Sequence, residues 1–159
     1  MAKILVVDDE KSIRSTFEIF LSKEGHDVVT ADDVSSAIAI FESQPLDLVI
    51  TDIIMPKSSG IELLHTVKSQ NPDIPVIIMT GEPTIETAKA SVKSSADDYL
   101  IKPVPKDILI KTANYALDKK KLNDDKNKLE LENAKYRANL EQLVFQRTEA
   151  LRKAVSGTI

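Results

Sequence analysis

The chain has 159 residues, enough for one domain of ordinary size with some length left over, and its lack of cysteine excludes disulfides, thiolate zinc sites and cysteine nucleophiles. Residues 1–118 carry 11 basic against 19 acidic side chains, a balance that disfavours binding to nucleic acid. Residues 119–159 carry 10 basic against 6 acidic side chains, interleaved as on a solvated helix face. No apolar run approaches the ~18 residues of a membrane span and no signal peptide precedes the first strand, so we expect a cytoplasmic protein without membrane contact.

Short apolar runs alternate with amphipathic helical segments five times over the first 118 residues. Strands are predicted at residues 4–7, 28–31, 46–51, 76–79 and 98–101, each followed by a helical pattern. Such short runs of β-branched and aliphatic residues are typical of buried parallel strands. The alternation therefore predicts an α/β fold, a doubly wound parallel sheet with helices on both faces.

Local signals mark the ends of the predicted helices. Ser12 is expected to cap the first helix, and Gly25 is well placed to end it. Pro45 should stop the second helix before the third strand. Pro83 should lie at the start of the fourth helix, and the fifth should begin near Lys106.

Chemically reactive side chains follow four of the predicted strands. They are Asp8 and Asp9 after the first, Asp52 after the third, Thr80 after the fourth and Lys102 after the fifth. Because the carboxyl ends of parallel strands share one edge, these groups should converge there. Mg²⁺ prefers oxygen ligands, which the aspartates supply. Ionised Asp52 is a competent nucleophile towards phosphorus. The ammonium of Lys102 is a point charge that suits a phosphate. The set predicts a site for Mg²⁺ and a phosphoryl group.

Each of these residues has a commoner structural explanation when taken alone. An aspartate after a strand is more often part of an Asx turn or a helix cap than a metal ligand. Thr80 could cap the following helix, and Lys102 could be a solvated surface lysine. Their joint placement at four strand ends favours the functional interpretation.

The C-terminal segment has a different pattern. No glycine or proline occurs between Lys106 and Gly157, which predicts one long helix. Apolar residues recur every seven positions, at Leu122, Leu129, Tyr136, Leu143 and Ala150. The companion row holds Leu140 and Ala154 together with the polar residues Lys126, Asn133 and Arg147. We favour a parallel homodimer through this seam over a single exposed helix, because so polar a helix has little else to hold it.

Four motifs at the strand ends have a family resemblance. They are Val6-Val7-Asp8-Asp9-Glu10, Asp52-Ile53-Ile54-Met55-Pro56 with Gly60, Thr80-Gly81, and Ala96-Asp97-Asp98-Tyr99-Leu100-Ile101-Lys102-Pro103. With them, residues 1–118 resemble the receiver domain of bacterial response regulators in two-component signalling. The resemblance implies a flavodoxin-like strand order of 2-1-3-4-5. It also implies that the chain is a regulatory domain, not an enzyme, and that Asp52 accepts a phosphoryl group from the phosphohistidine of a sensor histidine kinase.

The resemblance assigns roles to further groups. Mg²⁺ would be held by three carboxylates and one backbone carbonyl, those of Asp8, Asp9, Asp52 and Ile54. Thr80 and Lys102 would bind the phosphoryl oxygens. On phosphorylation Thr80 would move towards the phosphate and Tyr99 would turn inward, which would remodel the surface of the fourth helix, fifth strand and fifth helix. The bond between Lys102 and Pro103 is expected to be cis, as an X-Pro bond allows.

Four residues depart from the family pattern or occupy variable positions in it. Ser58 replaces an apolar residue, and Ser95 stands where glycine is common. Ile54 and Glu82 occupy the positions that tune dephosphorylation in the family. Because the apolar side chain of Ile54 cannot orient an attacking water, we expect a comparatively long-lived phosphorylated state.

The C-terminal segment also has a family resemblance. Residues 136–144 and 147–151 are similar to coiled-coil linkers that lead into output domains of larger regulators. We therefore expect a receiver domain at 1–118, a coiled-coil linker helix at 119–159, and an output domain outside this sequence to which the dimeric helix relays the signal. Two alternatives are a structural dimerisation module with an unused pocket and a small Mg²⁺-dependent aspartyl-phosphate phosphatase. The phosphatase usually needs a carboxylate where Ile54 stands.

Overall fold

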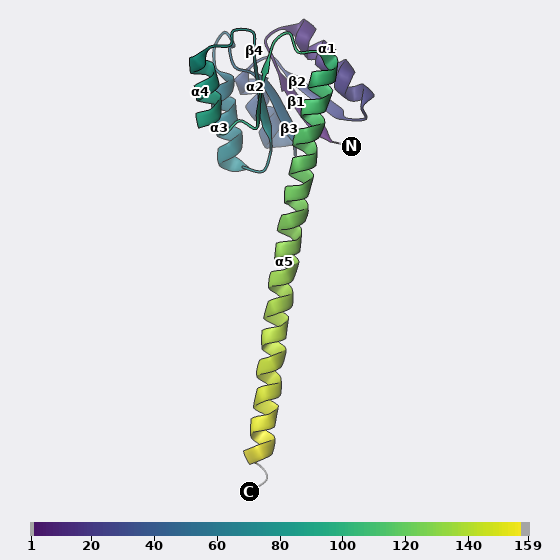
Figure 1. The fold of residues 1–159 in the computed structure, drawn as a ribbon, viewed down its shortest axis with the longest axis vertical. Coiled ribbons are helices and arrows are strands. Elements are labelled where there is room, and N and C mark those ends of the chain that lie inside the picture. Colours follow the sequence, from purple (N-terminus) through teal and green to yellow (C-terminus); the bar gives the residue numbers. More distant parts are fainter. Residues whose placement is uncertain (1, 157–159) are drawn as a thin grey trace. The chain divides into compact units, whose positions relative to one another are not determined.

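The computed structural model describes residues 2–156, which alternate between strand and helix five times (Figure 1). The strands are β1 (Lys3–Val7), β2 (Asp27–Ala31), β3 (Leu48–Asp52), β4 (Val76–Thr80) and β5 (Asp98–Ile101). The helices are α1 (Lys11–Lys23), α2 (Val34–Ser43), α3 (Gly60–Gln70), α4 (Ile85–Lys93) and α5 (Lys106–Ser156). The chain divides into two compact units, Met1–Lys121 and Leu122–Ile159.

The strands form one parallel sheet in the order β2-β1-β3-β4-β5, which confirms the predicted doubly wound, flavodoxin-like fold. Val7 lies opposite Thr51 in the register of β1 and β3, and Asp52 lies opposite Met79 in that of β3 and β4. The carboxyl ends of these strands therefore meet at one edge of the sheet, where the reactive side chains follow.

The sheet separates two hydrophobic clusters. On one face it packs against α1 and α5, through residues that include Ile50, Ile77, Phe17, Leu21 and Leu109. On the other face it packs against α2 and α3, through residues that include Val49, Ile78, Ala37, Leu63 and Leu64. All five residues of β3 and of β4 are buried, because successive side chains point to opposite faces and both faces are covered.

The expected cap of the first helix is wrong. Helix α1 begins at Lys11, so Ser12 lies inside it, and the N-cap position is occupied by Glu10 without a side-chain capping bond. The backbone N–H of Glu10 instead donates to Oδ1 of Asp8 at 2.9 Å. The helix therefore begins directly after this turn, one residue before Ser12.

The other predicted boundaries need smaller changes. The third strand begins at Leu48, two residues later than predicted, and its last residue is Asp52. Gly25 follows α1 with a φ of +87°, and its N–H donates to the carbonyl of Ser22 at 3.0 Å. The left-handed conformation explains why glycine is suited to this helix end.

Helix α5 has two parts with different surroundings. In the first unit Leu109, Ala113 and Ala116 of α5 are buried against the sheet. In the second unit no side chain from Leu122 to Val155 is buried. Among the described residues, no helix is both long enough and apolar enough to span a membrane.

Candidate functional site

The loop after β1 carries two of the three acidic side chains. Asp8 is fully buried, its Oδ1 accepts the N–H of Glu10, and its own N–H donates to the carbonyl of Ala31 at 3.2 Å. The guanidinium of Arg14 donates to the carbonyl of Asp8 at 2.7 Å. Asp9, the next residue, is exposed. One carboxylate is thus held inside the fold while its neighbour faces solvent.

Asp52 is held from both its carboxylate and its backbone. It is 5% exposed, and its Oδ1 accepts the N–H of Ile54 at 3.3 Å. The hydroxyl of Thr51 donates to the backbone carbonyl of Asp52 at 3.0 Å. A Cβ on Gly60 would lie 2.0 Å from that carbonyl oxygen, so only glycine allows α3 to begin so close to Asp52.

Lys102 joins the two buried carboxylates. Its Nζ lies 2.6 Å from Oδ2 of Asp8 and 2.9 Å from Oδ2 of Asp52. Burial lowers the pKa of Lys102, but the hydrogen bonds and charges of the two carboxylates outweigh this effect and leave the pKa above its ordinary value. The ammonium therefore stays charged. The peptide bond that follows, to Pro103, is cis, as predicted.

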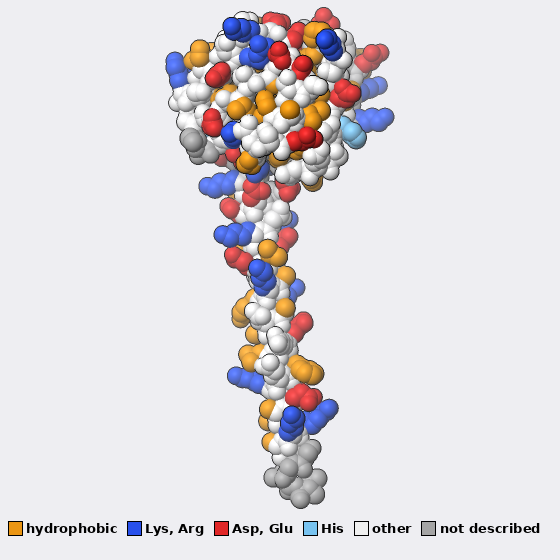
Figure 2. Space-filling view, turned by 180° about the vertical axis from the view of Figure 1, so that it is seen from behind, with side chains coloured by type: hydrophobic (Ala, Val, Ile, Leu, Met, Phe, Trp, Pro, Cys, Tyr) orange, Lys and Arg blue, Asp and Glu red, His pale blue; other side chains and the backbone are white. Residues whose placement is uncertain are grey.

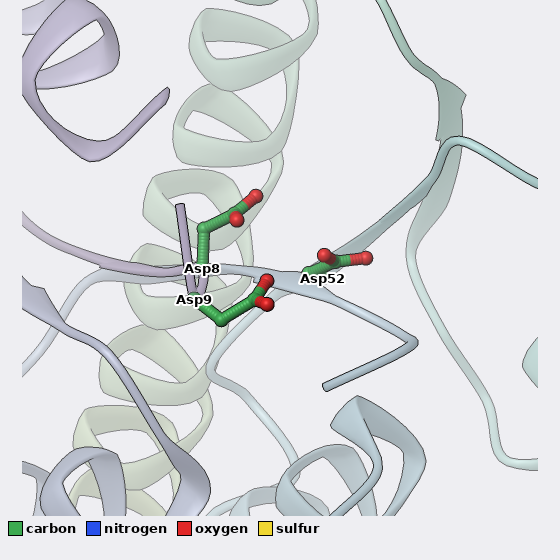
Figure 3. A group of neighbouring side chains, drawn as sticks. All are labelled: Asp8, Asp9 and Asp52. Atoms are coloured by element: carbon green, nitrogen blue, oxygen red, sulfur yellow. The ribbon is translucent and has the colours of Figure 1, made fainter. Parts of the chain in front are cut away.

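The three aspartates form a compact acidic cluster. Oxygen atoms of Asp8, Asp9 and Asp52 all lie within 4.8 Å of one another, at the carboxyl ends of β1 and β3 (Figure 3). Burial is the main reason that the pKa of Asp8 is raised, and the charge of Asp52 adds to it, while Lys102 and the Glu10 N–H oppose the rise. The three carboxylates outnumber the one ammonium beside them, so the cluster has the negative charge and the oxygen ligands that suit a divalent cation.

Thr80 lies one residue beyond the register partner of Asp52. It is fully buried, and its hydroxyl oxygen accepts the backbone N–H of Glu82 at 3.0 Å. Its carbonyl accepts the backbone N–H of Lys102 at 2.8 Å, which ties the ends of β4 and β5 together. Thr80 is thus placed at the predicted edge, and Glu82 is bound to it through the backbone while its side chain is exposed.

Tyr99 contacts the start of α4. Its ring is half-buried, and its hydroxyl lies 3.0 Å from Oγ1 of Thr87. Thr87 and Thr84 form a capping box at the N-terminus of α4, in which each side chain accepts the other residue's backbone N–H. The part played by Thr87 was not predicted. The T-x-x-T spacing is a capping signal, but nothing in the sequence connects it to Tyr99.

The side chains of the remaining predicted residues do not contact the acidic cluster, although the backbone N–H of Ile54 does. The side chain of Ile54 is 49% exposed and lines an open cavity of about 360 Å³ between the loop after β3 and helix α4. The predicted dimer-seam residues are all exposed, by 42% to 70%, and they are Leu122, Leu129, Tyr136, Leu140 and Leu143. Their pairing stays a prediction.

Sequence comparison places these features in a known family. The profile of the response regulator receiver domain matches residues 4–114. The probable transcriptional regulatory protein TcrX of Mycobacterium tuberculosis is 39% identical over 100 residues, which are 63% of this chain and 43% of TcrX. Response regulator MprA of Mycobacterium ulcerans is 32% identical over 123 residues, which are 77% of this chain and 53% of MprA. The chain spans about half the length of these curated relatives.

Structural comparison agrees with the sequence match. The crystal structure of a response regulator receiver domain protein from Clostridium thermocellum superposes with a TM-score of 0.72 at 39% sequence identity. The superposition covers 77% of this chain and 98% of that protein. The similarity therefore covers the sheet and the helices around the acidic cluster.

Proposed function

The chain belongs to the response regulator receiver domain family, and on that premise we propose that Asp52 accepts a phosphoryl group and that helix α5 relays the resulting change. Receiver domains of this family act in two-component signalling. The observation that carries the proposal is the position of the Asp52 carboxylate, 2.9 Å from the Lys102 ammonium and within 4.8 Å of two further carboxylates.

The transfer needs little from the protein beyond positioning and charge neutralisation. An oxygen of the ionised Asp52 carboxylate attacks the phosphorus, the bond from phosphorus to the histidine nitrogen of the donor breaks, and the imidazole leaves with that electron pair. Lys102 already contacts Oδ2 of Asp52, so its ammonium is placed to bind an oxygen of the incoming phosphoryl group. The N–H of Ile54 holds the other carboxylate oxygen.

The residues present suit Mg²⁺. Asp8, Asp9 and Asp52 supply the oxygen ligands that this ion prefers, Asp9 keeps the cluster open to solvent, and we assign a further ligand to the backbone carbonyl of Ile54. Mg²⁺ bound there would offset the repulsion among the carboxylates and the charge of the phosphoryl oxygens. Arg14 and the N–H of Glu10 hold Asp8, which would keep its carboxylate in position for the ion before phosphorylation.

Thr80 and Tyr99 would report phosphorylation. The hydroxyl of Thr80 accepts the N–H of Glu82, and it would turn to donate to a phosphoryl oxygen. Tyr99 would then leave Thr87 and turn inward, which would change the start of α4. These two movements would alter the surface formed by α4, β5 and α5. We infer that the signal leaves the receiver through this surface.

The donor and the destination of the signal follow from the family and the pattern of α5. Response regulators receive their phosphoryl group from sensor histidine kinases, and we propose such a kinase in the cytoplasm as the donor. We assign residues 1–118 to the receiver and residues 119–159 to a linker helix that forms a homodimer. Regulation, not turnover of a substrate, is the function we propose for this part of the chain.

Intact mass after incubation with acetyl phosphate and Mg²⁺ tests the proposal. We expect one phosphoryl adduct that requires Mg²⁺ and is absent from Asp52→Asn. Asp98→Asn is the matched control, since Asp98 lies at the start of β5, at the opposite edge of the sheet, and should leave the adduct intact. Absence of an adduct in the folded wild-type chain, with no binding of beryllofluoride, would favour the structural-module alternative.

The phosphatase alternative depends on the residue two positions after Asp52. Ile54 offers no carboxylate, so we expect no turnover of a generic phosphomonoester such as p-nitrophenyl phosphate. For the same reason we expect slow hydrolysis of the phosphorylated state. Ile54→Asn should shorten its half-life, because an amide can orient a water beside the phosphoryl group, and an unchanged decay rate would contradict this.

A further inference from the structure

The apolar surface of α5 widens towards its C-terminus. Between Leu122 and Tyr136 the seven-residue row is flanked on one side by the polar residues Asn123, Glu130 and Arg137. From Leu140 onward the corresponding flanking positions hold Val144 and Leu151, which are 63% and 67% exposed. Figure 2 shows apolar side chains between charged ones along this helix. The N-terminal half therefore has one possible seam and the C-terminal half has two.

The two seams differ in spacing. The first continues the seven-residue repeat through Leu143 and Ala150. The second passes through Val144 and Leu151, and it requires an eleven-residue step from Asn133 to Val144. Such a step is a four-residue stutter in the repeat, which locally unwinds a coiled coil without breaking its helices. Both seams contain Leu140 and Arg147, which exchange between the two alternating core positions of the repeat. A small rotation of the helix therefore converts one seam into the other.

A second copy of this chain, parallel and in register, fits this surface best. Lys126, Asn133 and Arg147 all fall in one row, so only a parallel pair places each of them opposite its own counterpart and away from leucine. In a parallel pair, each residue in the row of Lys126 packs against the same residue of the second copy and against the residue just before it in the sequence. Lys126 would therefore lie next to Asp125 of the second copy. Glu132 would likewise face Arg137 of the second copy. Opposite charges therefore meet at two levels of the N-terminal half.

We propose that two copies of α5 pair in parallel through a fixed N-terminal seam and two alternative C-terminal seams, and that phosphorylation at Asp52 shifts the balance between them. The inference rests on the proposed homodimer and deepens it. Since both seams contain Leu140 and Arg147 and each adds two apolar residues, their free energies are close enough for a modest bias to change the populations. Phosphorylation can reach the seams because α5 also packs against the sheet through Leu109.

Disulfide crosslinking of the full chain tests the two seams, because the sequence contains no cysteine of its own. Leu143→Cys reports the first seam, Val144→Cys the second, and Leu129→Cys the N-terminal seam common to both. Phe145→Cys is the matched control, since position 145 faces away from the partner in either arrangement. Rates of oxidative crosslinking would be compared with and without beryllofluoride and Mg²⁺.

We expect the variants at 143 and 144 both to crosslink faster than the one at 145, and the ratio of their rates to change about fivefold or more with beryllofluoride. If either crosslinks no faster than the control in both states, or if the ratio does not change, the inference is wrong while the dimer stands. If Leu129→Cys also fails to crosslink and the chain sediments as a monomer in both states, the proposed dimer itself fails. The proposal that Asp52 is phosphorylated would stand after either result.

Discussion

Helices α3 and α4 follow neighbouring strands, yet they are attached to the body in opposite ways. Helix α3 buries Leu63, Leu64 and Val67 in the core, and its first residue, Gly60, sits against the carbonyl of Asp52. Helix α4 buries Ser91 alone. Its larger apolar side chains face solvent, with Ile85 75% exposed and Val92 81% exposed. One helix is held by burial and the other is not.

Hydrogen bonds at its two ends stabilise α4 itself. Thr84 and Thr87 form the capping box at its start, and Tyr99 joins that box through Thr87. At its end Ser95 has a φ of +67°, and its N–H donates to Val92 at 3.1 Å. Helices with few buried contacts open at low free energy. The phosphoacceptor therefore lies between a fixed side, α3, and a side that can move, α4.

Truncation of a buried leucine should give the largest contrast between the two helices. Leu64→Ala should lower the free energy of unfolding by about 2–5 kcal/mol, because it removes buried methyl groups and leaves a cavity. Val92→Ala, the matched change on α4, should stay within about 0.5 kcal/mol. Urea denaturation measures both. Equal losses in the two variants would show that α4 is anchored by packing after all.

Gly60→Ala should come next in size. Its Cβ would overlap the Asp52 carbonyl, so the loop or the strand end has to move, at a cost of about 1–3 kcal/mol. Because the displaced residue is the proposed phosphoacceptor, phosphorylation by acetyl phosphate should slow as well. Gly81→Ala is the control, since its Cβ would meet Lys102 only at 3.9 Å. Normal stability and phosphorylation of Gly60→Ala would contradict the fixed-side interpretation.

Loss of the capping box should weaken α4 locally. Thr84→Ala should cost the helix about 1 kcal/mol, which corresponds to roughly fivefold faster amide exchange in α4. Thr66→Ala on α3 removes a half-buried threonine whose hydroxyl donates to the carbonyl of Glu62 within the helix, and it should be nearly neutral. Mass spectrometry of exchanged peptides measures both. No acceleration in α4 would mean that the box does not hold the helix.

Ser95→Gly should have the opposite sign. The positive φ of Ser95 is strained for a residue with a Cβ, and Ala96 completes the helix end by donating its N–H to Ser91 at 3.0 Å. Glycine should therefore raise the free energy of unfolding by about 0.5–1 kcal/mol. Ser94→Gly, one position earlier, has an ordinary φ and should lower it. A loss from Ser95→Gly would show that the serine makes a compensating contact.

The smallest effect concerns the cap of α2, the neighbour of α3. The backbone N–H of Ser36, with its side chain, lowers the pKa of Asp33 from its ordinary value. A lowered pKa means that the stabilisation is present above the unfolded value of 3.8 and is lost as pH falls through the folded value. Asp33→Asn caps without titrating, so the wild type should lose stability relative to it on acidification. A pH-independent difference would contradict this.

The sequence was sufficient for the fold and for the convergence of the acidic cluster. The central strands β1, β3 and β4 are short runs that are buried on both faces, and Asp8, Asp52 and Lys102 stand at the ends of such apolar runs. A parallel sheet brings strand ends together whatever the loops between them do. The placement of these side chains could therefore be predicted, while their roles remain proposals.

Contacts that depend on side-chain reach could not be predicted. Arg14 bonds the carbonyl of Asp8 from one turn inside α1, and Thr87 meets the hydroxyl of Tyr99 from another element. The Ser12 cap was wrong because Asp8 already held the Glu10 N–H, a competition between two local signals that the sequence does not rank. Such contacts follow from rotamers and the approach of distant backbone, which leave no periodic signal.

Amide hydrogen exchange of the full chain, with and without beryllofluoride in the presence of Mg²⁺, can show whether α4 responds to occupation of Asp52 while α3 does not. Occupation of Asp52 by the phosphoryl mimic should change exchange in α4 and around Tyr99, while α3 keeps its protection, because only the α4 side lacks buried anchors. Asp52→Asn should show no change in either helix. Equal changes in α3 and α4, or no change in α4 although the mimic binds, would contradict the account.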